Sequence, residues 1–379
     1  MKKFLPLTLA AAALLTAMTS ASAESFESDG FRFTVTDSRN ADVSFDGLVS
    51  GSDATSIDIP QSVSYQGTDY EVTSLANGAF INNTMLETVS IPSGIQAIPD
   101  SLFLGCTSLV QVTVPSSLES LGTGSFVGCT SLTELDLGNT GITALGSASG
   151  TKVTYIFWDE NHRDPALETI VLPESLEVIG NYTFYYCPLT DVSLPWTLTT
   201  IGASAFSAPE ATDPCLGQDT LIIPGSVTRI AYQAFEHCNI QKLIILPAAT
   251  KSTTPTLTIE GLAFWREGSM AEVWCTQDVP PTMKDNSFYT TQYSAPLYVE
   301  SEADIPEYQA AAGWKNFTEI HARAIATGIE SVDTAPDAPH LTDVYTMTGL
   351  RVRHNVDAAT ATDGLPSGLY IVNGHKIQL

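Results

Sequence analysis

The amino-acid sequence predicts a β-rich solenoid in which coils of about 22–23 residues stack through parallel strands. One phrase recurs along the chain: apolar-x-apolar-Pro, a short polar stretch, Ile-Gly or a relative, and then Phe. The spacing of the copies is fixed, because the Pro or Gly positions 92, 115 and 138 lie 23 residues apart. Positions 173 and 195 lie 22 apart, and positions 224 and 247 lie 23 apart. Since one coil cannot bury its own apolar edge, equivalent coils must stack.

Each part of the phrase predicts one part of a coil. The apolar-x-apolar segment alternates with a period of two, which is typical of a strand with one buried face. The Pro that follows has no N–H to donate, so it ends every strand at the same place. The Ile-Gly turn reverses the chain, and the Phe returns to fill the core. The copies begin at Ile57–Pro60, Val89–Pro92, Val112–Pro115, Leu135–Gly138, Ile170–Pro173, Val192–Pro195 and Leu221–Pro224.

A leading leucine indicates the class of repeat. Leu stands six residues before the Pro or Gly at Leu86, Leu109, Leu132, Leu167 and Leu189. A period of roughly 20–29 residues with a Leu-x-x-apolar-x-apolar core is typical of leucine-rich repeats. The expected fold is therefore a leucine-rich-repeat solenoid with N- and C-terminal caps and a small C-terminal β module.

The phrase followed by Phe-x-x-Cys resembles the BspA-like leucine-rich repeat of secreted bacterial surface proteins, over roughly residues 26–322. Residues 26–80 resemble the N-terminal cap of that family. Tyr308–Phe317 resembles the closing segment, a short helix that runs into a Trp-containing strand. The resemblance implies extracellular protein binding or adhesion and brings no catalytic residues with it.

The first residues predict export from the cell. Lys2 and Lys3 precede an apolar run from Phe4 to Met18, and Ala21-Ser22-Ala23 is a pattern that a signal peptidase accepts. The run is shorter than the roughly 20 residues that span a bilayer, which disfavours a transmembrane anchor. We therefore expect a signal peptide at 1–23, no membrane span after cleavage, and a secreted or bacterial cell-surface protein, at the outer membrane or beyond it.

The remaining chain divides into four predicted parts. Residues 24–80 form the N-terminal cap and first repeat, and residues 81–250 form the repeats, with an insertion near 141–165. Residues 251–325 hold irregular repeats and the C-terminal cap. Residues 326–379 read as a β module with a hairpin turn at Asn373-Gly374, since Asn-Gly favours tight two-residue turns. This module resembles the C-terminal sorting modules of secreted Bacteroidetes proteins, and a plain β appendage is the alternative.

Composition and missing motifs argue against several functions. The formal net charge of −26 disfavours nucleic acid and anionic lipid as partners. The six histidines show no metal-ligand spacing, and the sequence has no phosphate-binding Gly-rich loop and no Gly-x-Ser-x-Gly elbow. We therefore expect no cofactor, no metal and no enzymatic activity.

Four of the six cysteines occupy one position of the repeat, three residues after a Phe: Cys106, Cys129, Cys187 and Cys238. A metal site and disulfides are two interpretations of this pattern. A ladder of buried thiols is the favoured interpretation, because free Cys packs as a small apolar residue. Cys215 and Cys275 lie outside the phrase, and whether they pair stays open.

The outward residues of the strands predict a binding surface. They form a row across the coils that changes from polar to apolar along the rod: Ser90, Thr113, Asp136, Val171, Ser193, Ile222 and Ile245. Glu134 lies beside this row. An apolar stretch at Val171, Ile222 and Ile245 would suit a partner, with burial beneath inserted loops as the alternative.

Aromatic residues near the insertions are further candidates for binding. Trp158 and Trp196 are expected as exposed anchors, with Tyr155 close by, because Trp is enriched at the centres of interfaces. Local packing is the alternative for each Trp. Two functions remain: binding of an extracellular protein, from a host or a neighbouring cell, or binding of a glycan through Trp158, Trp196 and acidic side chains.

Overall fold

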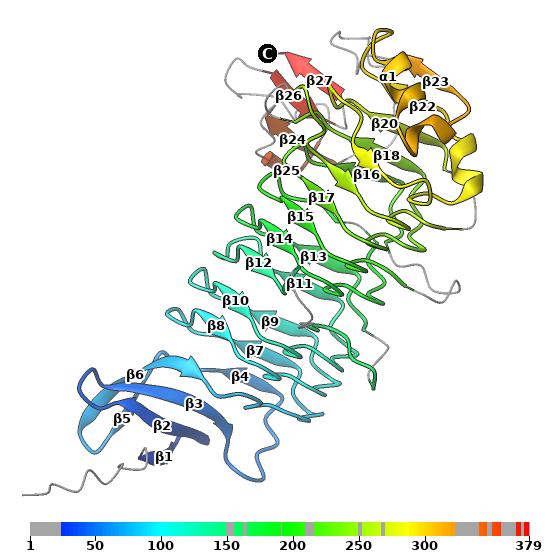
Figure 1. Cartoon of the computed structure of the whole chain (residues 1–379). Coiled ribbons are helices and arrows are strands. Elements are labelled where there is room, and N and C mark those ends of the chain that lie inside the picture. The colour runs from blue at the N-terminus through cyan, green and yellow to red at the C-terminus, as the bar shows by residue number, and fades with distance from the viewer. Residues whose placement is uncertain are drawn as a thin grey trace, which may run out of the picture.

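The computed structural model confirms the solenoid as a rod of stacked coils (Figure 1). It describes residues 24–148, 155–161, 165–190, 192–208, 216–248, 252–266, 270–322, 341–346, 351–357, 369–372 and 375–378. The predicted signal peptide, Cys215, His162 and the Asn373-Gly374 turn lie outside the described residues. Of the residues that are described, none belongs to a helix both long and apolar enough to cross a membrane.

A five-stranded sheet closes the N-terminal end of the solenoid. Its order is β1 (Ser25–Ser28), β2 (Phe31–Asp37), β3 (Asp42–Leu48), β6 (Thr68–Leu75) and β5 (Ser62–Tyr65). Phe33 and Phe45 are fully buried beneath it, and the Phe45 ring lies 5.4 Å from that of Phe80 in the first coil. The cap thus hides the apolar end of the stack, as a solenoid requires.

Most coils contribute one strand to each of two parallel ladders. The first ladder contains β4 (Ser56–Asp58), β7 (Thr88–Ser90), β9 (Gln111–Thr113), β11 (Glu134–Asp136), β13 (Thr169–Val171), β16 (Thr220–Ile223), β18 (Lys242–Ile245), β20 (Glu272–Cys275), β22 (Leu297–Val299) and β23 (Ile320–Ala322). The second contains β8 (Ala97–Ile98), β10 (Ser120–Leu121), β12 (Ala144–Leu145), β14 (Val178–Ile179), β15 (Thr200–Ile201), β17 (Arg229–Ile230), β19 (Thr258–Ile259) and β21 (Thr282–Met283). Strands after Pro247 stay in the ladders although the sequence period blurs there.

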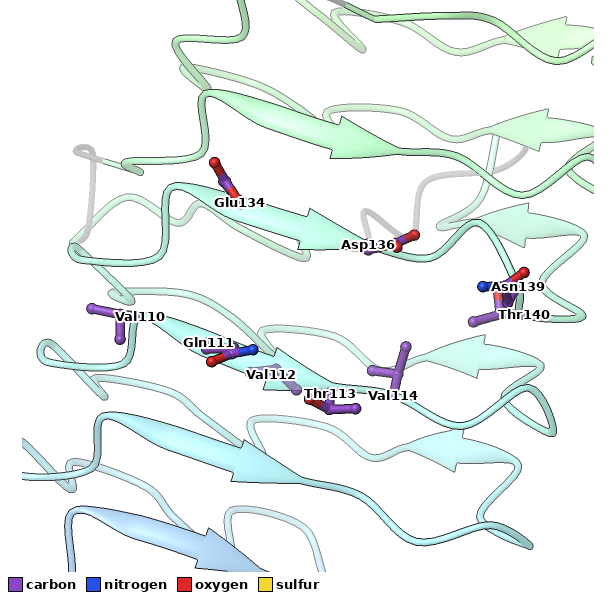
Figure 2. A pocket seen from close by; sticks show the side chains of 9 residues that line it. All are labelled: Val110, Gln111, Val112, Thr113, Val114, Glu134, Asp136, Asn139 and Thr140. Atoms are coloured by element: carbon purple, nitrogen blue, oxygen red, sulfur yellow. The ribbon is translucent and has the colours of Figure 1, made fainter. Parts of the chain in front are cut away.

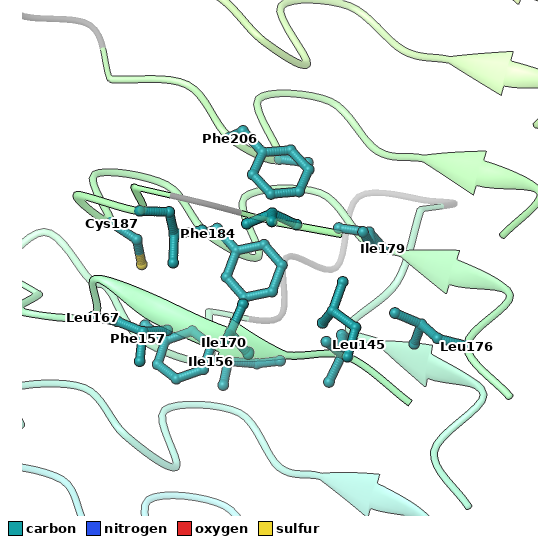
Figure 3. Packing of buried hydrophobic residues seen from close by; sticks show 14 of the residues in the cluster. Leu145, Ile156, Phe157, Leu167, Ile170, Leu176, Ile179, Phe184, Cys187 and Phe206 are labelled. Carbon is teal, nitrogen blue, oxygen red and sulfur yellow. The ribbon is translucent and has the colours of Figure 1, made fainter. Parts of the chain in front are cut away.

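The repeat phenylalanines form a continuous spine in the core, of which Figure 3 shows Phe157, Phe184 and Phe206. Successive ring centroids lie 5.1–5.7 Å apart, with the planes inclined by at most 29°. The spine consists of Phe80, Phe103, Phe126, Phe157, Phe184, Phe206, Phe235, Phe264 and Phe288. Offset stacks of this kind add to the stabilisation that burial alone provides.

The glycine of the Ile-Gly turn lets neighbouring coils approach closely. A Cβ at Gly202 would lie 2.4 Å from the carbonyl carbon of Gly180, in the preceding coil. A Cβ at Gly180 would lie 2.4 Å from the amide nitrogen of Ser147. Because real Cβ atoms never come so near to main-chain atoms, these turns require Gly for the coil spacing itself.

The thiols of the cysteine ladder are buried and free. The thiols of Cys106, Cys129 and Cys238 donate to the carbonyls of Phe80, Phe103 and Phe206, one coil earlier, over 3.0–3.3 Å. Cys187 and Cys275 are also free and buried. The described cysteines therefore form neither a disulfide nor a group of metal ligands.

We expect these five thiols to resist modification in the native protein. Burial raises the pKa of the Cys106 and Cys275 thiols to about 12, so almost no thiolate exists at pH 8. The ordinary pKa of a thiol in the unfolded chain is 9.0. The contribution of the buried, neutral thiols to the free energy of unfolding is therefore fully present below pH 9 and is lost as the pH rises above it. Thiol titration in denaturant without reductant should find at least these five groups, and fewer than four would contradict the ladder of Cys106, Cys129, Cys187 and Cys238.

A short helical segment closes the C-terminal end of the solenoid. It comprises η1 (Thr290–Ser294), α1 (Ile305–Ala310) and η2 (Trp314–Asn316). The expectation that Trp314 lies in a strand is wrong, because it belongs to a 3₁₀ turn. Its ring is fully buried, and its Nε1 donates to the Pro281 carbonyl over 2.8 Å. The strand follows later, as β23.

The C-terminal residues form a separate antiparallel sheet. Its order is β25 (Arg351–Asp357), β24 (Leu341–Thr346), β26 (Leu369–Val372) and β27 (His375–Gln378). None of these strands pairs with a strand of the solenoid.

Candidate functional site

The outward side of the first ladder, here called the strand face, presents one row of side chains across the coils. Alternation along β11 places Leu135 in the core at 2% exposure, whereas Glu134 and Asp136 are exposed. The strand pairing aligns Asp136 with Val171 of the next coil, which is half-buried. From the first described coil to the last, the row is Asp58, Ser90, Thr113, Asp136, Val171, Ser193, Ile222, Ile244, Trp274, Tyr298 and His321.

Ile245, which the sequence places in this row, is instead a core residue. It is fully buried and pairs with Ile223, while Ile244 pairs with the outward-facing Ile222. The cause is one additional residue, Leu246, between this strand and its Pro. Because side chains alternate in a strand, a shift of one residue moves each of them to the opposite face.

The C-terminal end of the strand face carries a second, smaller hydrophobic cluster. The apolar cluster consists of Trp196, Ile222, Ile244, Leu246, Trp274 and Tyr298. Ile244 and Trp274 are each only 8% exposed, and the Trp274 ring lies 4.7 Å from that of Tyr298. Lys242 Nζ lies 4.9 Å above the Trp274 ring and 2.5 Å from Glu272. The cluster is packed within itself, and only its rim, such as Trp196 and Ile222, stays half-buried.

Sequence reasoning missed Trp274, Tyr298 and His321 as members of the row. The segments Val273–Cys275 and Leu297–Val299 alternate as strands do, but neither is followed by the Pro that marks earlier copies. The period-two pattern alone could have found them.

Trp158 and Tyr155 lie in the coil stack, away from the strand face. The expectation that Trp158 is an exposed anchor is wrong, because the side chain is 7% exposed. Its ring stacks on Tyr186 at 5.7 Å and meets Tyr185 edge-on at 4.8 Å. Phe157 completes the spine of this coil, so residues 155–158 form part of the coil itself.

The strand ladders are interrupted between two coils in the middle of the rod. Within the described ranges, one sheet ends at β9 and another begins at β11, and no backbone hydrogen bond joins the two strands. The second ladder breaks at the same level, between β10 and β12. The coils still touch on their other sides, where Gly141 N donates to Leu118 O and Phe126 N donates to Ile156 O, each over 2.9 Å.

The interruption opens a groove of about 660 Å³ on the strand face (Figure 2). Its lining comprises Val110, Gln111, Val112, Thr113, Val114, Glu134, Asp136, Asn139 and Thr140. Val110 is 50% exposed at the start of β9. Val112 and Leu121 retain 8% and 7% exposure, although the equivalent Val89 and Ile98 have 2% and 1%. Val112, which lines the groove, is therefore slightly less buried than its equivalent in the preceding coil.

A neighbouring irregularity of the ladder is filled by a side chain. No strand is assigned at residues 192–194, between β13 and β16. There the Gln218 Oε1 accepts from Val192 N over 2.8 Å, and its Nε2 donates to Thr220 O over 2.9 Å. The side-chain amide of Gln218 thus takes the place of main-chain hydrogen bonds in the ladder. No described side chain bridges β9 and β11 in this way.

The carboxylates of the groove can accept hydrogen bonds and can attract positively charged groups. Its lining includes two carboxylates, Glu134 and Asp136, and no basic residue. One Asp136 oxygen accepts from Gly138 N over 2.8 Å, and the group remains exposed to solvent. Among the described residues no three His, Cys, Asp or Glu side chains gather as metal ligands.

Comparison with known proteins identifies related repeats. The family model described as the BspA type leucine rich repeat region matches in six copies, over residues 49–156, 159–216 and 213–309. A leucine-rich-repeat protein of T. pallidum is 24% identical over 59% of this chain and 85% of its own, with a TM-score of 0.37. A leucine-rich cell-surface protein of Faecalibacterium prausnitzii is 18% identical over 80% and 96%, with a TM-score of 0.38. No curated protein sequence matches the chain.

Proposed function

Because the chain belongs to the BspA-type leucine-rich-repeat family, we propose that it is a secreted or cell-surface protein that binds an extracellular protein through its strand face. A binding role accords with the architecture. The solenoid offers a long surface of exposed outward side chains.

The groove between β9 and β11 carries the proposal. It is a concave opening of about 660 Å³ on the strand face, and it combines exposed carboxylates with an exposed Val110. Concave sites with a few polar groups are the usual places of recognition. The apolar cluster at the C-terminal end of the strand face also favours this face as the binding surface. Its half-buried residues Trp196 and Ile222 would enlarge the area that a large partner covers.

Glycan binding is the less favoured alternative. A sugar platform needs an exposed planar ring beside Asp or Asn, and Trp158 is enclosed by Tyr185 and Tyr186. Trp196 packs against the apolar cluster. Neither tryptophan therefore offers the free ring face that the glycan hypothesis required.

Removal of the groove charges tests the function. The full chain, probed on arrays of extracellular-matrix proteins and of glycans, should bind one or more proteins, and E134Q/D136N should weaken that binding at least tenfold, which corresponds to about 1.4 kcal/mol. E119Q/E177Q is the matched control, since it removes two exposed carboxylates beside the second ladder. Binding to glycans alone, or equal affinities for the two double variants, would contradict the proposal.

The ends of the chain support the proposed location. The sequence of residues 1–23 has the features of an export signal. The antiparallel sheet β24–β27 pairs with no solenoid strand, which suits a module that acts separately from the binding face. We assign residues 326–379 to sorting or attachment at the surface on these grounds.

A further inference from the structure

We propose that the antiparallel sheet β24–β27 packs face to face on the C-terminal end of the strand face and covers the apolar cluster. The contact forms within one chain and needs no strand pairing, so it goes beyond the binding role proposed above. Three observations carry it: the deep burial of outward-facing residues in the cluster, the small size of the C-terminal sheet, and the position of that sheet along the rod.

Outward-facing residues at the centre of the apolar cluster are as buried as core residues. Elsewhere on the strand face, outward residues such as Thr113 and Asp136 are exposed. Ile222 and Ile244 are the same residue type at paired positions, yet Ile222 is half-buried and Ile244 is only 8% exposed. The large Trp274, next in the row, is also only 8% exposed. Ladder neighbours lie beside these side chains, so burial of their outer ends indicates a cover above the sheet.

The aromatic residues of the cluster have partners in addition to one another. Trp196, Trp274 and Tyr298 each take part in at least one further hydrogen bond, ring contact or electrostatic interaction beyond those described above. All three belong to the apolar cluster or pack against it. Such contacts at one end of an outward face indicate that another part of the chain lies against it.

The C-terminal sheet is too small to be stable without a second layer. Residues 341–379 contain no cysteine. A chain of this length, below roughly 40 residues, usually needs disulfides, a metal or association with another surface, because it buries too little apolar area by itself. The inner strand β26 reads Leu-Tyr-Ile-Val, a continuous apolar run that is typical of a strand buried on both faces. The apolar cluster offers such a surface.

The link between the two sheets allows the contact. Residues 323–340 join β23 to β24 and span up to roughly 60 Å when extended. The strands β16, β18, β20, β22 and β23 follow one another in one sheet, so the cluster lies within roughly 20 Å of β23. In Figure 1 the sheet β24–β27 lies level with β16, β18 and β20 rather than beyond the end of the rod. Sheets that pack face to face lie about 10 Å apart, which agrees with the separate strand orders.

The charge of the C-terminal sheet favours the same contact. Residues 341–379 contain three Lys or Arg and three Asp or Glu residues, so the net charge of −26 lies in the rest of the chain. The acidic solenoid therefore does not repel this sheet. The basic residues Arg351 and Arg353 of β25 suit a face that carries carboxylates such as Glu272.

The contact sets a limit to the binding surface. It covers the centre of the cluster, at Ile244 and Trp274, in the free chain. The groove, which lies N-terminal to the cluster on the strand face, stays outside the contact. A partner that extends from the groove over the centre of the cluster must therefore displace the C-terminal sheet.

Photo-crosslinking in the intact chain tests the contact. Tyr298 is replaced by p-benzoylphenylalanine, an aromatic residue that reacts with whatever lies against it. Thr258 is the matched control site, because it is exposed on the second ladder within two coils of Tyr298 and the link reaches it equally well. Mass spectrometry should place crosslinks from position 298 within residues 341–379, at a yield at least fivefold above that from position 258.

A pair of lysine substitutions locates the contact on the strand face. Ile244→Lys puts a charge at the centre of the contact and should lower the crosslinking yield from position 298 at least fivefold. Thr113→Lys alters an exposed residue of the same row and should leave the yield unchanged. Equal yields from positions 298 and 258, or crosslinks from position 298 confined to the solenoid, would overturn the proposal. Equal yields in the two lysine variants would overturn it as well.

Discussion

Phe206→Ala is expected to lower the free energy of unfolding by about 3–5 kcal/mol, the range for large buried aromatic side chains. Phe206 is 1% exposed and lies at the middle of the spine. Its ring stacks on Phe184 at 5.2 Å and on Phe235 at 5.1 Å, so its removal leaves a cavity between two coils and takes one of two stacking partners from each of these rings. Guanidinium unfolding followed by far-UV circular dichroism measures the change.

The control for this substitution is Tyr232→Ala, at an aromatic residue that is 46% exposed in a neighbouring coil. Exposed substitutions of this kind change stability by about 0.5 kcal/mol or less. Since coils contact only their neighbours, the loss at Phe206 can also appear as partial unfolding, and the unfolding curve should be tested for a second transition. Similar losses for the two variants would contradict the stacked spine.

Gly202→Ala is expected to destabilise the protein by about 1–3 kcal/mol or more, although it adds a single methyl group. The new Cβ would lie 2.4 Å from the Gly180 carbonyl carbon and 2.5 Å from Asn181 N, both in the backbone of the preceding coil. Neither atom can move without separating the coils. Thermal unfolding of the full chain measures the effect.

Gly217→Ala is the matched control, because the atom nearest to its new Cβ, Leu189 O, lies 4.0 Å away. That variant should unfold within a few degrees of the parent protein. If Gly202→Ala were as stable as Gly217→Ala, close packing at the Ile-Gly turn would not set the coil spacing.

The sequence predicted those parts of the fold that depend on local patterns. Alternation within each phrase identifies the strands, and fixed spacing identifies the equivalent Phe and Cys positions. The spine and the thiol ladder follow from that equivalence, because residues at one position of a repeat meet in space. The change of the strand face from polar Asp136 to apolar Ile222 was predicted on the same grounds.

The remainder depends on contacts that a local pattern does not contain. Ile245 was misplaced because Leu246 shifts the strand by one residue relative to its Pro. Trp158 was expected to be exposed because an insertion looks like a loop, whereas its neighbour Phe157 returns the chain to the spine. The groove results from hydrogen bonds that are missing between β9 and β11 of adjacent coils, and the β11 sequence departs from the phrase only in having Gly138 in place of Pro.

Hydrogen exchange of the free full chain tests the open ladder between β9 and β11 most directly. Val112 and Val114 amides should exchange much faster than those of Ile91 and Leu137, which donate to the next coil over 2.9 Å. Equal, strong protection at all four amides would show a closed, continuous ladder and would contradict the groove on which the proposed binding depends.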